Sequence, residues 1–300
     1  MGGFRGCEYT QKCSCLEYAD VDEERLEASN PEAYTDYLAQ KAAGETSFLG
    51  LPKKFPYMVP KDRKYPSTLT PFYRNSRHPI YECNSRCNCG ASCKSRLVQK
   101  GRRVPLTIFK TPNRGWGVRC EEELIAGEFI DIYLGEVISN SETSQRESAD
   151  GILKGSYLYS LDKFTDEVDG LTKETCHVVD GQYMGNVGRF INHSCVPNVR
   201  QHTVSYNKND FWVYDLAFFA IERIPKGTEL VFDYADRDDE EDEVVIAKRE
   251  RKLRDPKFAG LPRCNCGEYA CRGFLWDDED KDEEQDEVVS VDGDGVRMRV

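Results

Sequence analysis

The sequence lacks the features that mark membrane, secreted and common nucleotide-binding proteins. No apolar run in the 300-residue sequence approaches the roughly 20 consecutive apolar residues that a membrane span requires. The opening residues, MGGFRGCEYT, contain no apolar signal-peptide core. There is also no Gly-x-Gly-x-x-Gly fingerprint, no Gly-x-x-x-x-Gly-Lys phosphate loop and no Gly-x-Ser-x-Gly elbow. We therefore expect a soluble, non-secreted protein with neither a Rossmann nor a P-loop nucleotide site.

Negative charge is concentrated in two short runs. The chain has 41 Lys and Arg against 53 Asp and Glu, a formal net charge of −12. Most of the excess lies in residues 236–243 (DRDDEEDE) and 277–287 (DDEDKDEEQDE), and the rest of the chain is close to neutral. These runs favour basic partners over duplex DNA, so we expect no direct sequence-specific DNA binding and no membrane partner. Solvated, disordered runs without a partner are the alternative, above all for residues 277–300.

The thirteen cysteines are clustered rather than scattered. Without a secretion signal we expect a reducing compartment, where dense cysteine clusters bind zinc more often than they form disulfides. Seven of them flank a long insert: Cys7, Cys13, Cys15, Cys83, Cys87, Cys89 and Cys93. Two tetrahedral zinc ions that share one thiolate need seven ligands, and three ions with three shared thiolates need nine. The count fits the smaller cluster, and two further ligands upstream of Met1 are the alternative.

A second zinc site is predicted near the C-terminal end. Cys264, Cys266 and Cys271 supply three thiolates, one short of a tetrahedral set, and Cys195 is the natural fourth ligand. Such a site would place the C-terminal segment beside the polar pair Asn192-His193, which follows an apolar stretch. A structural turn is the alternative interpretation of that pair. The remaining thiols, Cys120 and Cys176, receive no role and are expected to be small buried residues.

Between Pro105 and Tyr234 the sequence consists of short apolar or alternating runs separated by turns. The runs are LTIFK (106–110), WGVRC (116–120), FIDIYLGEVI (129–138), SYLYSL (156–161), HVVDG (177–181), FWVYDLAFFAI (211–221) and ELVFDY (229–234). This spacing predicts a β-rich domain of many short strands. Helical patterns are confined to residues 22–43, 139–155 and 244–254.

Four fragments occur in the order found in SET-domain protein lysine methyltransferases. They are Gly115-Trp116-Gly117, Tyr133-Leu134-Gly135-Glu136, RFINHSCVPN (189–198) and ELVFDY (229–234). The flanking cysteines resemble the pre-SET and post-SET zinc modules of the Su(var) class, which methylates lysine nine of histone H3, and the fungal members in particular. The resemblance covers roughly residues 7–15 and 80–276. It departs from the family in the N-terminal cysteines. The pre-SET module of the family has nine cysteines, and the first Cys-x-Cys pair among them is absent here.

The resemblance implies a mainly β fold with minor α. It is the SET-domain (β-clip) fold of short strands in small sheets, flanked by zinc-cysteine modules. We expect a pre-SET zinc module at 1–94, with a long insert at 16–80, followed by a SET catalytic domain at 95–235. A charged loop at 236–262 comes next, and an autoregulatory role is one interpretation of it. A post-SET zinc module at 263–276 and an acidic disordered tail at 277–300 complete the order.

The resemblance also implies a pocket for S-adenosylmethionine. By similarity, its residues are Arg114, Gly115, Trp116, Tyr157, Arg189, Asn192 and His193. They offer a turn backbone, aromatic faces and polar side chains. Aromatic faces and oxygen acceptors stabilise a sulfonium cation without attacking it.

An aromatic channel for the substrate lysine is carried over in the same way. Its residues are Tyr133, Tyr159, Phe232, Tyr234 and Trp276, with Tyr234 as the first candidate for the catalytic hydroxyl and Tyr133 as the second. In the family, Phe at position 232 leaves room for successive methyl groups, so we expect di- and trimethylation. Tyr159 stands where relatives usually have Phe, and its hydroxyl is expected to narrow the channel. Core aromatics of a β-rich domain are the alternative.

The expected substrate is the histone H3 tail, docked as an added strand. Asp162 is the candidate acceptor for a basic residue beside the target lysine, with a solvated turn aspartate as the alternative. The implied setting is chromatin in the nucleus, with heterochromatin formation and gene silencing on the chromosome. Two other functions remain open: methylation of a non-histone protein, and a zinc-stabilised chromatin-binding module without catalysis.

Overall fold

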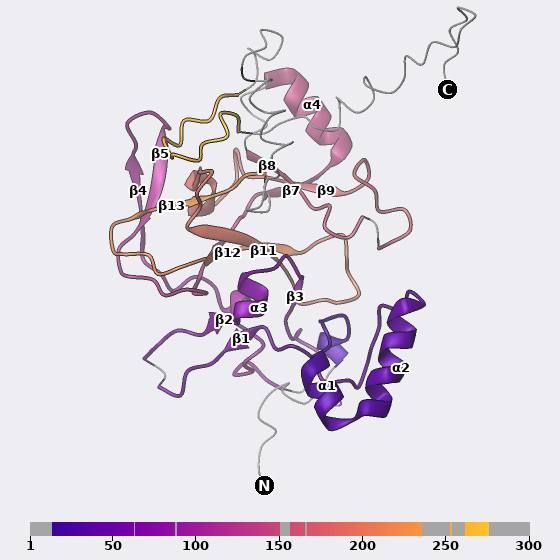
Figure 1. Ribbon diagram of the computed structural model, residues 1–300. Helices are drawn as coiled ribbons and strands as arrows, with labels where there is room; N and C mark the ends of the chain where they lie inside the picture. The colour runs from indigo at the N-terminus through magenta and orange to yellow at the C-terminus, as the bar shows by residue number, and fades with distance from the viewer. Residues whose placement is uncertain are drawn as a thin grey trace, which may run out of the picture.

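Short strands make up most of the regular structure in the part of the chain that the computed structural model describes. That part comprises residues 14–62, 64–87, 89–150, 157–165, 167–235, 253 and 262–275, without the side chains of 147–150. The helices are α1 (Glu23–Ser29), α2 (Pro31–Ala42), α3 (Pro71–Arg74) and α4 (Asn140–Asp150), with 3-10 turns at Ser14–Leu16, Val98–Lys100 and Val187–Phe190. The strands are β1 (Tyr57–Met58), β2 (Thr68–Leu69), β3 (Ile80–Tyr81), β4 (Leu106–Lys110), β5 (Trp116–Cys120), β6 (Phe129–Ile132), β7 (Glu136–Ser139), β8 (Leu158–Ser160), β9 (His177–Asp180), β10 (Asn192–His193), β11 (Val199–Ser205), β12 (Asp215–Ala220) and β13 (Glu229–Phe232) (Figure 1). The predicted mainly β fold with minor α is confirmed.

The first sheet joins strands that are far apart in the sequence. Its order is β10-β13-β5-β4, with β10 parallel to β13 and the other neighbours antiparallel. β4 and β5 occupy the residues that the sequence predicts and form a hairpin, from Leu106 opposite Cys120 to Lys110 opposite Trp116. The turn between them contains Gly115 at φ +72°, a left-handed conformation that glycine adopts without a steric penalty.

Two further sheets have the orders β3-β11-β12-β6 and β7-β9-β8, and β1 pairs with β2. Helix α4 packs against β7 and β9. Strand β11 was not among the predicted runs, although it is central in its sheet and pairs with β12 from Val199 opposite Ala220 to Val204 opposite Asp215. Its sequence, VRQHTVS, has polar residues at half-buried positions, so its hydrophobic pattern is weak.

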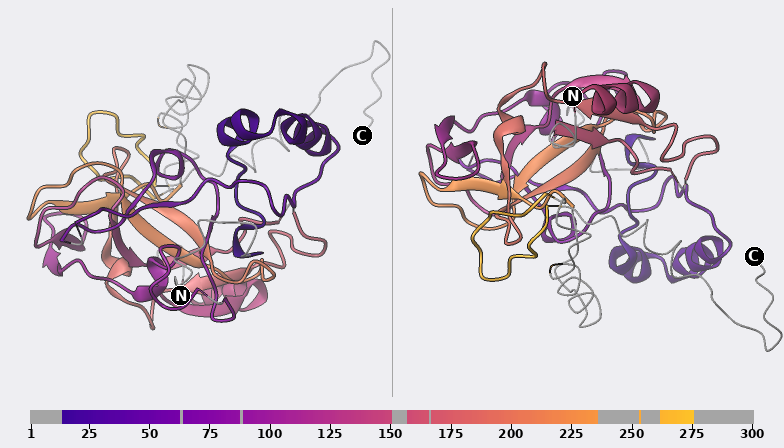
Figure 2. Two further views of the ribbon diagram at one scale, coloured as in Figure 1. Left: turned by 90° about the horizontal axis from the view of Figure 1, so that it is seen from below. Right: turned by 90° about the horizontal axis from the view of Figure 1, so that it is seen from above.

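The helical pattern at residues 22–43 divides into two helices because Asn30 and Pro31 interrupt it. The side chain of Asp22 caps α1 by accepting a hydrogen bond from the Arg25 amide. Asn30 ends α1 and caps α2, where its side chain accepts from the Ala33 amide, and Pro31 occupies the first turn of α2. The pair α1 and α2 projects at one end of the molecule, apart from the sheets (Figures 1 and 2).

Two apolar clusters hold the sheets together. The larger contains fully buried Val118, Ile130, Phe218 and Leu230 and packs against the aromatic residues of the predicted channel. The smaller joins Leu69 and Tyr73 of the insert to Phe129 and Phe219. Burying side chains of this size stabilises a fold by about 1.5–3 kcal/mol each. The part of the insert that carries Leu69 and Tyr73 is therefore packed onto the domain.

Glu82 anchors the polypeptide between the cysteine cluster and the first sheet. Its carboxylate is 1% exposed and accepts hydrogen bonds from the Tyr57 hydroxyl and from the amides of Leu97 and Val98. Donors to a buried carboxylate offset the cost of removing the charge from water. The segment that leaves the cysteine cluster is held in this way against the insert.

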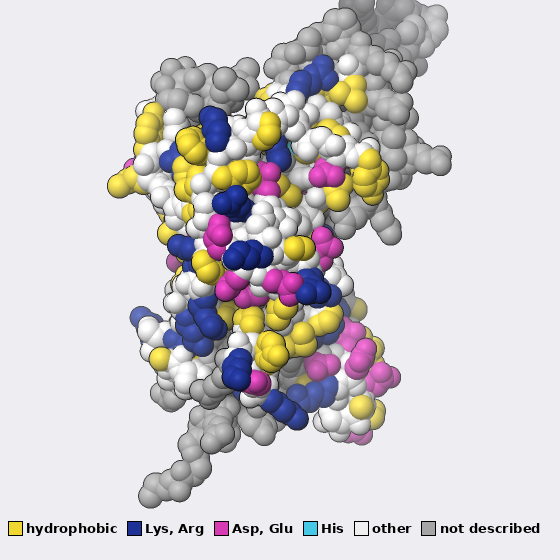
Figure 3. All heavy atoms as spheres, turned by 90° about the vertical axis from the view of Figure 1, so that its left-hand side faces the viewer, with side chains coloured by type: hydrophobic (Ala, Val, Ile, Leu, Met, Phe, Trp, Pro, Cys, Tyr) yellow, Lys and Arg dark blue, Asp and Glu magenta, His cyan; other side chains and the backbone are white. Residues whose placement is uncertain are grey.

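The surface carries mixed charge. On the face in Figure 3, Lys and Arg side chains alternate with Asp and Glu among scattered apolar ones, and neither sign covers the described area. Within the described residues, no helix combines the length and the apolar character needed to cross a bilayer.

We expect His202 to make the fold sensitive to mild acid. Its ring is 3% exposed and lies edge-on to Phe219, with centroids 5.5 Å apart, and burial lowers the pKa of His202 to about 3. Below its ordinary pKa near 6.5, the unfolded chain binds a proton that the folded chain does not. The free energy of unfolding then falls by about 1.4 kcal/mol per pH unit from this residue.

His202→Phe removes that contribution. Urea denaturation at pH 7 and pH 5 should show a loss of stability smaller by about 2 kcal/mol in the variant than in the parent protein. Protonation of cysteine sites affects both proteins equally, so the difference between them isolates His202. Equal losses in the two proteins would contradict a buried, neutral His202.

Candidate functional site

A short parallel pairing brings the polar and aromatic motifs together. Asn192 and His193 of β10 lie opposite Val231 and Phe232 of β13. The amide of Ser194 donates to the Phe232 carbonyl at 3.0 Å, which extends the pairing by one residue. Residues from two motifs separated by more than thirty positions in the chain are therefore neighbours in space.

Glu229, for which no role was predicted from the sequence, organises the polar side of this site. Its Oε2 lies 2.7 Å from Arg114 Nη2, and its Oε1 accepts from Asn192 Nδ2 at 2.9 Å. The same Asn192 nitrogen donates to the Trp116 carbonyl at 3.0 Å, and Arg114 Nη1 donates to the His193 carbonyl at 3.3 Å. One half-buried carboxylate thus orients two candidate binding side chains.

The spacing around this carboxylate requires a residue without a side chain at position 117. A Cβ added to Gly117 would lie 2.8 Å from both Glu229 Oε1 and Thr111 Cγ2. The neighbouring indole of Trp116 is 53% exposed, with Lys110 Nζ 5.1 Å from its ring centre. The Gly-Trp-Gly fragment therefore presents backbone and an aromatic face at the surface while allowing Glu229 to approach.

Arg189, in the 3-10 turn that precedes β10, provides a buried donor. Its guanidinium lies 4.7 Å from the ring centre of Tyr157, an aromatic residue that precedes β8. Arg189 Nε is buried and has no hydrogen-bond partner among the described residues. An unpaired buried N–H is costly, and a ligand with carboxylate or hydroxyl oxygens would supply its acceptor.

Four predicted channel residues form one aromatic cluster. The rings of Phe232 and Tyr234 are 4.8 Å apart, those of Tyr133 and Tyr159 are 6.1 Å apart, and Phe232 also contacts Phe218 at 4.9 Å. Trp276, the fifth predicted residue, lies outside the described residues. Burial raises the pKa of Tyr133 and of Tyr234 well above the ordinary value of tyrosine, so both hydroxyls stay protonated at neutral pH.

A pocket of about 300 Å³ opens beside this cluster. Tyr159, Tyr234 and Asp162 line it, together with Gln201 and His202 of β11. Asp162 is exposed at the rim, and desolvation by the surrounding protein raises the pKa of its carboxyl group. The pocket therefore combines an aromatic wall with one carboxyl group, and the cationic side chains of Arg77 and Lys163 also line it.

His193 connects the aromatic cluster to the C-terminal cysteines. Its ring is 3% exposed, its Nδ1 accepts from the Tyr234 amide at 3.2 Å, and its Nε2 lies 3.3 Å from Cys195 Sγ. The ring also stands edge-on to Tyr234, with centroids 5.3 Å apart. The backbone of Tyr234 is thereby tied to a cysteine.

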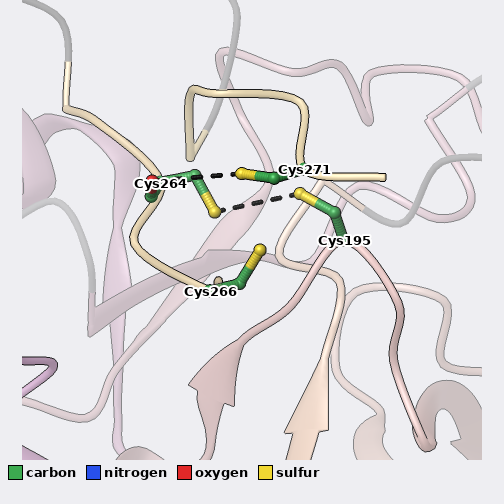
Figure 4. Close-up of side chains that lie close together, drawn as sticks. All are labelled: Cys195, Cys264, Cys266 and Cys271. Carbon is green, nitrogen blue, oxygen red and sulfur yellow. Dashed lines mark hydrogen bonds between the residues drawn. The ribbon is translucent and has the colours of Figure 1, made fainter. Parts of the chain in front are cut away.

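The predicted C-terminal zinc ligands lie together. The sulfurs of Cys195, Cys264, Cys266 and Cys271 are all within 4.8 Å of one another, with Cys195 facing the three others (Figure 4). The sulfurs of Cys195 and Cys264 are 3.8 Å apart, close to the value of about 3.8 Å for a tetrahedron with Zn–S bonds near 2.3 Å. A hydrogen bond from Cys264, aided by His193 and the Arg272 amide, lowers the pKa of Cys195 and favours the thiolate that binds zinc.

The N-terminal cysteines form two groups that share one thiol. One contains Cys15, Cys83 and Cys87, and the other contains Cys83, Cys89 and Cys93. Cys83 is fully buried, and its sulfur lies 3.7 Å from that of Cys93. A thiol common to two groups is the geometry that a bridging thiolate requires. The other two predicted ligands, Cys7 and Cys13, lie outside the described residues.

The two unassigned thiols are buried, as expected. Cys120 and Cys176 are 0% and 1% exposed, and burial raises the pKa of each. None of the described cysteines forms a disulfide.

Comparisons with known proteins agree with this site. The sequence matches the SET domain family over residues 115–235, which span β5 to β13. It is 38% identical to the H3 lysine-9 specific histone-lysine N-methyltransferase KMT1 of Fusarium mangiferae over 90% of this chain and 74% of that protein. It is 43% identical to the H3 lysine-9 specific enzyme dim-5 of Neurospora crassa over 67% of this chain and 60% of that protein.

A solved structure is similar as well. It is Arabidopsis thaliana SUVH6 in complex with SAM, at 36% identity and a TM-score of 0.51, covering 66% of this chain and 38% of that one. The fold and the β10–β13 site define a SET-domain protein. The chain belongs to the SET-domain histone-lysine N-methyltransferases.

We expect Cys271→Ser to lower the zinc content by about one ion per chain, because a serine hydroxyl is a poor replacement for a thiolate. Zinc bound by the Cys83 groups should remain, since none of their thiols comes from the C-terminal segment. Elemental analysis of the purified protein measures both. Cys176→Ser, in a buried thiol outside both groups, is the matched control and should keep the parent zinc content. Parent-like zinc in Cys271→Ser would rule out this ligand set.

Proposed function

We propose that this protein transfers methyl groups from S-adenosylmethionine to lysine nine of the histone H3 tail. The observation that carries the proposal is the β10–β13 pairing, which places polar binding residues and an aromatic cluster side by side. Two relatives, KMT1 and dim-5, are named as specific for H3 lysine 9, which supports the choice of substrate.

The residues around Glu229 suit the cofactor. Asn192 and Arg114 are oriented by one carboxylate, and the buried Arg189 Nε can donate to an oxygen of the cofactor. Trp116 and Tyr157 add aromatic surface beside these polar groups. Bound S-adenosylmethionine would supply a methyl group on a sulfonium sulfur, an electrophile that the neutral lysine nitrogen could take up with the thioether as leaving group.

The aromatic cluster prepares the lysine. A free lysine has a pKa near 10.4, so roughly one molecule in 10³ carries a neutral amine at neutral pH. Phe232 and the tyrosine rings around it disfavour the ammonium by desolvation, which lowers the lysine pKa. We assign the orienting hydroxyl to Tyr234, with Tyr133 as the second candidate. Both hydroxyls stay protonated, and each donates a hydrogen bond to a backbone carbonyl that fixes its position. Trp276 is proposed as a further wall of the channel.

The peptide is proposed to lie along the free edge of β8. β8 is the last strand in the order β7-β9-β8, so one of its edges is unpaired within that sheet. An extended tail can add there through backbone hydrogen bonds. Tyr159 of this strand then faces the target lysine, and Asp162, two residues beyond it, is placed to accept from an adjacent basic residue.

The proposed layout keeps the pre-SET module at 1–94, the SET domain at 95–235 and the post-SET module at 263–276. A chromatin role follows from the family, and we propose nuclear heterochromatin as the location, with gene silencing as the outcome. The charged loop at 236–262 and the tail at 277–300 lie outside the described residues, apart from Leu253 and Pro262.

Mass spectrometry of an H3-tail peptide incubated with the protein and S-adenosylmethionine tests the function. We expect added methyl groups on lysine nine, none on a peptide with arginine at that position, and a rate lower by about 10²-fold or more in Tyr234→Phe. Tyr73→Phe serves as the control, because Tyr73 belongs to the other apolar cluster and its hydroxyl donates to the Lys54 carbonyl. Methylation elsewhere than lysine nine, or none by the zinc-loaded protein, would refute the proposal.

The cluster around Phe232 also predicts how many methyl groups are added. Phe232 is 5% exposed and packed between Phe218 and Tyr234, so a hydroxyl added to its ring must occupy channel space. We expect Phe232→Tyr to lower the ratio of trimethyl to monomethyl product about tenfold, the rate equivalent of roughly 1.4 kcal/mol. The same mass spectra report the ratio at equal consumption of peptide, and an unchanged ratio would remove Phe232 as the determinant.

A further inference from the structure

The three tyrosine hydroxyls of the aromatic cluster differ in what accepts their hydrogen bonds. Tyr133 donates to the Tyr157 carbonyl at 2.7 Å, and Tyr234 donates to the Ile191 carbonyl at 2.9 Å. Tyr159 donates to a side chain, Oε1 of Gln201, at 2.6 Å. Backbone acceptors persist whatever the sequence, whereas the acceptor of Tyr159 depends on which residue stands at position 201.

Gln201 is well placed to hold this hydroxyl. It lies on β11 opposite Phe218, within the six-residue antiparallel pairing of β11 with β12, which holds its backbone in place. Its side chain is half-buried and lines the same pocket as Tyr159 and Tyr234. An acceptor on such a rigid element keeps the phenol hydroxyl pointed toward β11.

The direction of this hydroxyl matters because the nitrogen of the substrate changes with each transfer. An unmodified or monomethylated amine has N–H groups that can bond to a nearby hydroxyl, but a dimethylated amine that is ready to react has none. A tyrosine hydroxyl turned into the channel would favour the first transfer and oppose the third, both by hydrogen bonding and by occupying the space of a methyl group. A hydroxyl committed to Gln201 does neither.

We propose that Gln201 is a positioning residue that sets the number of methyl groups added, by holding the Tyr159 hydroxyl out of the lysine channel. The inference rests on the proposed methyl transfer and concerns the relative rates of the successive transfers. It assigns to β11 a role in product specificity, separate from the role of Phe232 on β13.

The test compares rates on unmodified and dimethylated H3-tail peptides within each variant, so that partial loss of folded protein cancels. Gln201→Leu removes the acceptor with little change in volume. We expect the rate on dimethylated peptide, divided by the rate on unmodified peptide, to fall roughly 5- to 10-fold, the equivalent of one hydrogen bond of ordinary strength. Gln201→Glu keeps an acceptor oxygen in either protonation state and should keep the parent ratio.

The double variant Tyr159→Phe/Gln201→Leu separates positioning from packing. With no hydroxyl to release, it should regain the ratio of Tyr159→Phe alone. An unchanged ratio in Gln201→Leu, or a low ratio that persists in the double variant, would overturn the proposal. Failure of the proposed function is a different outcome, in which the parent protein methylates neither peptide.

Discussion

The two-residue parallel pairing of β10 with β13 is the constraint on which the site depends. It sets His193 opposite Phe232 and Asn192 opposite Val231, so the polar and aromatic motifs share one location. Asn198 reinforces the pairing, because its side chain donates to the Glu229 carbonyl and accepts from the Val231 amide. A slip of one residue would reverse the faces of every side chain on β10 and separate the two motifs.

So short a strand needs support from outside its sheet, and the C-terminal cysteines provide it. Cys195 follows β10 by two residues and meets three thiols from a segment about seventy residues later. Arg272 in that segment forms an ion pair with Asp233, which precedes Tyr234, and its amide donates to Cys195 Sγ at 3.3 Å. Zinc binding at these thiols would therefore be coupled to the conformation of both strands, because the free energy of metal binding also stabilises the folded segments that carry the ligands.

The sequence predicted the parts of this structure that depend on local pattern or on residue type. Strands β4 and β5 stand out as short, mostly apolar runs bounded by turns, and three thiols with one missing partner pointed to Cys195. Strand β11 escaped prediction because its partners, not its own residues, make it a strand. Glu229 stood in a recognised motif, yet its function comes from Arg114 and Asn192, which only the folded chain brings within reach.

The contacts of the site fall into two kinds with different consequences for chemistry. Tyr133 and Tyr234 are fixed through backbone carbonyls, so the groups that orient the amine depend little on neighbouring side chains. The hydroxyl of Tyr159 donates to Gln201, a side chain on another sheet. Substitution at position 201 can therefore alter the shape of the channel while the hydroxyls proposed for catalysis stay in place. The capacity to transfer a methyl group and the number transferred are in this way controlled by separate residues.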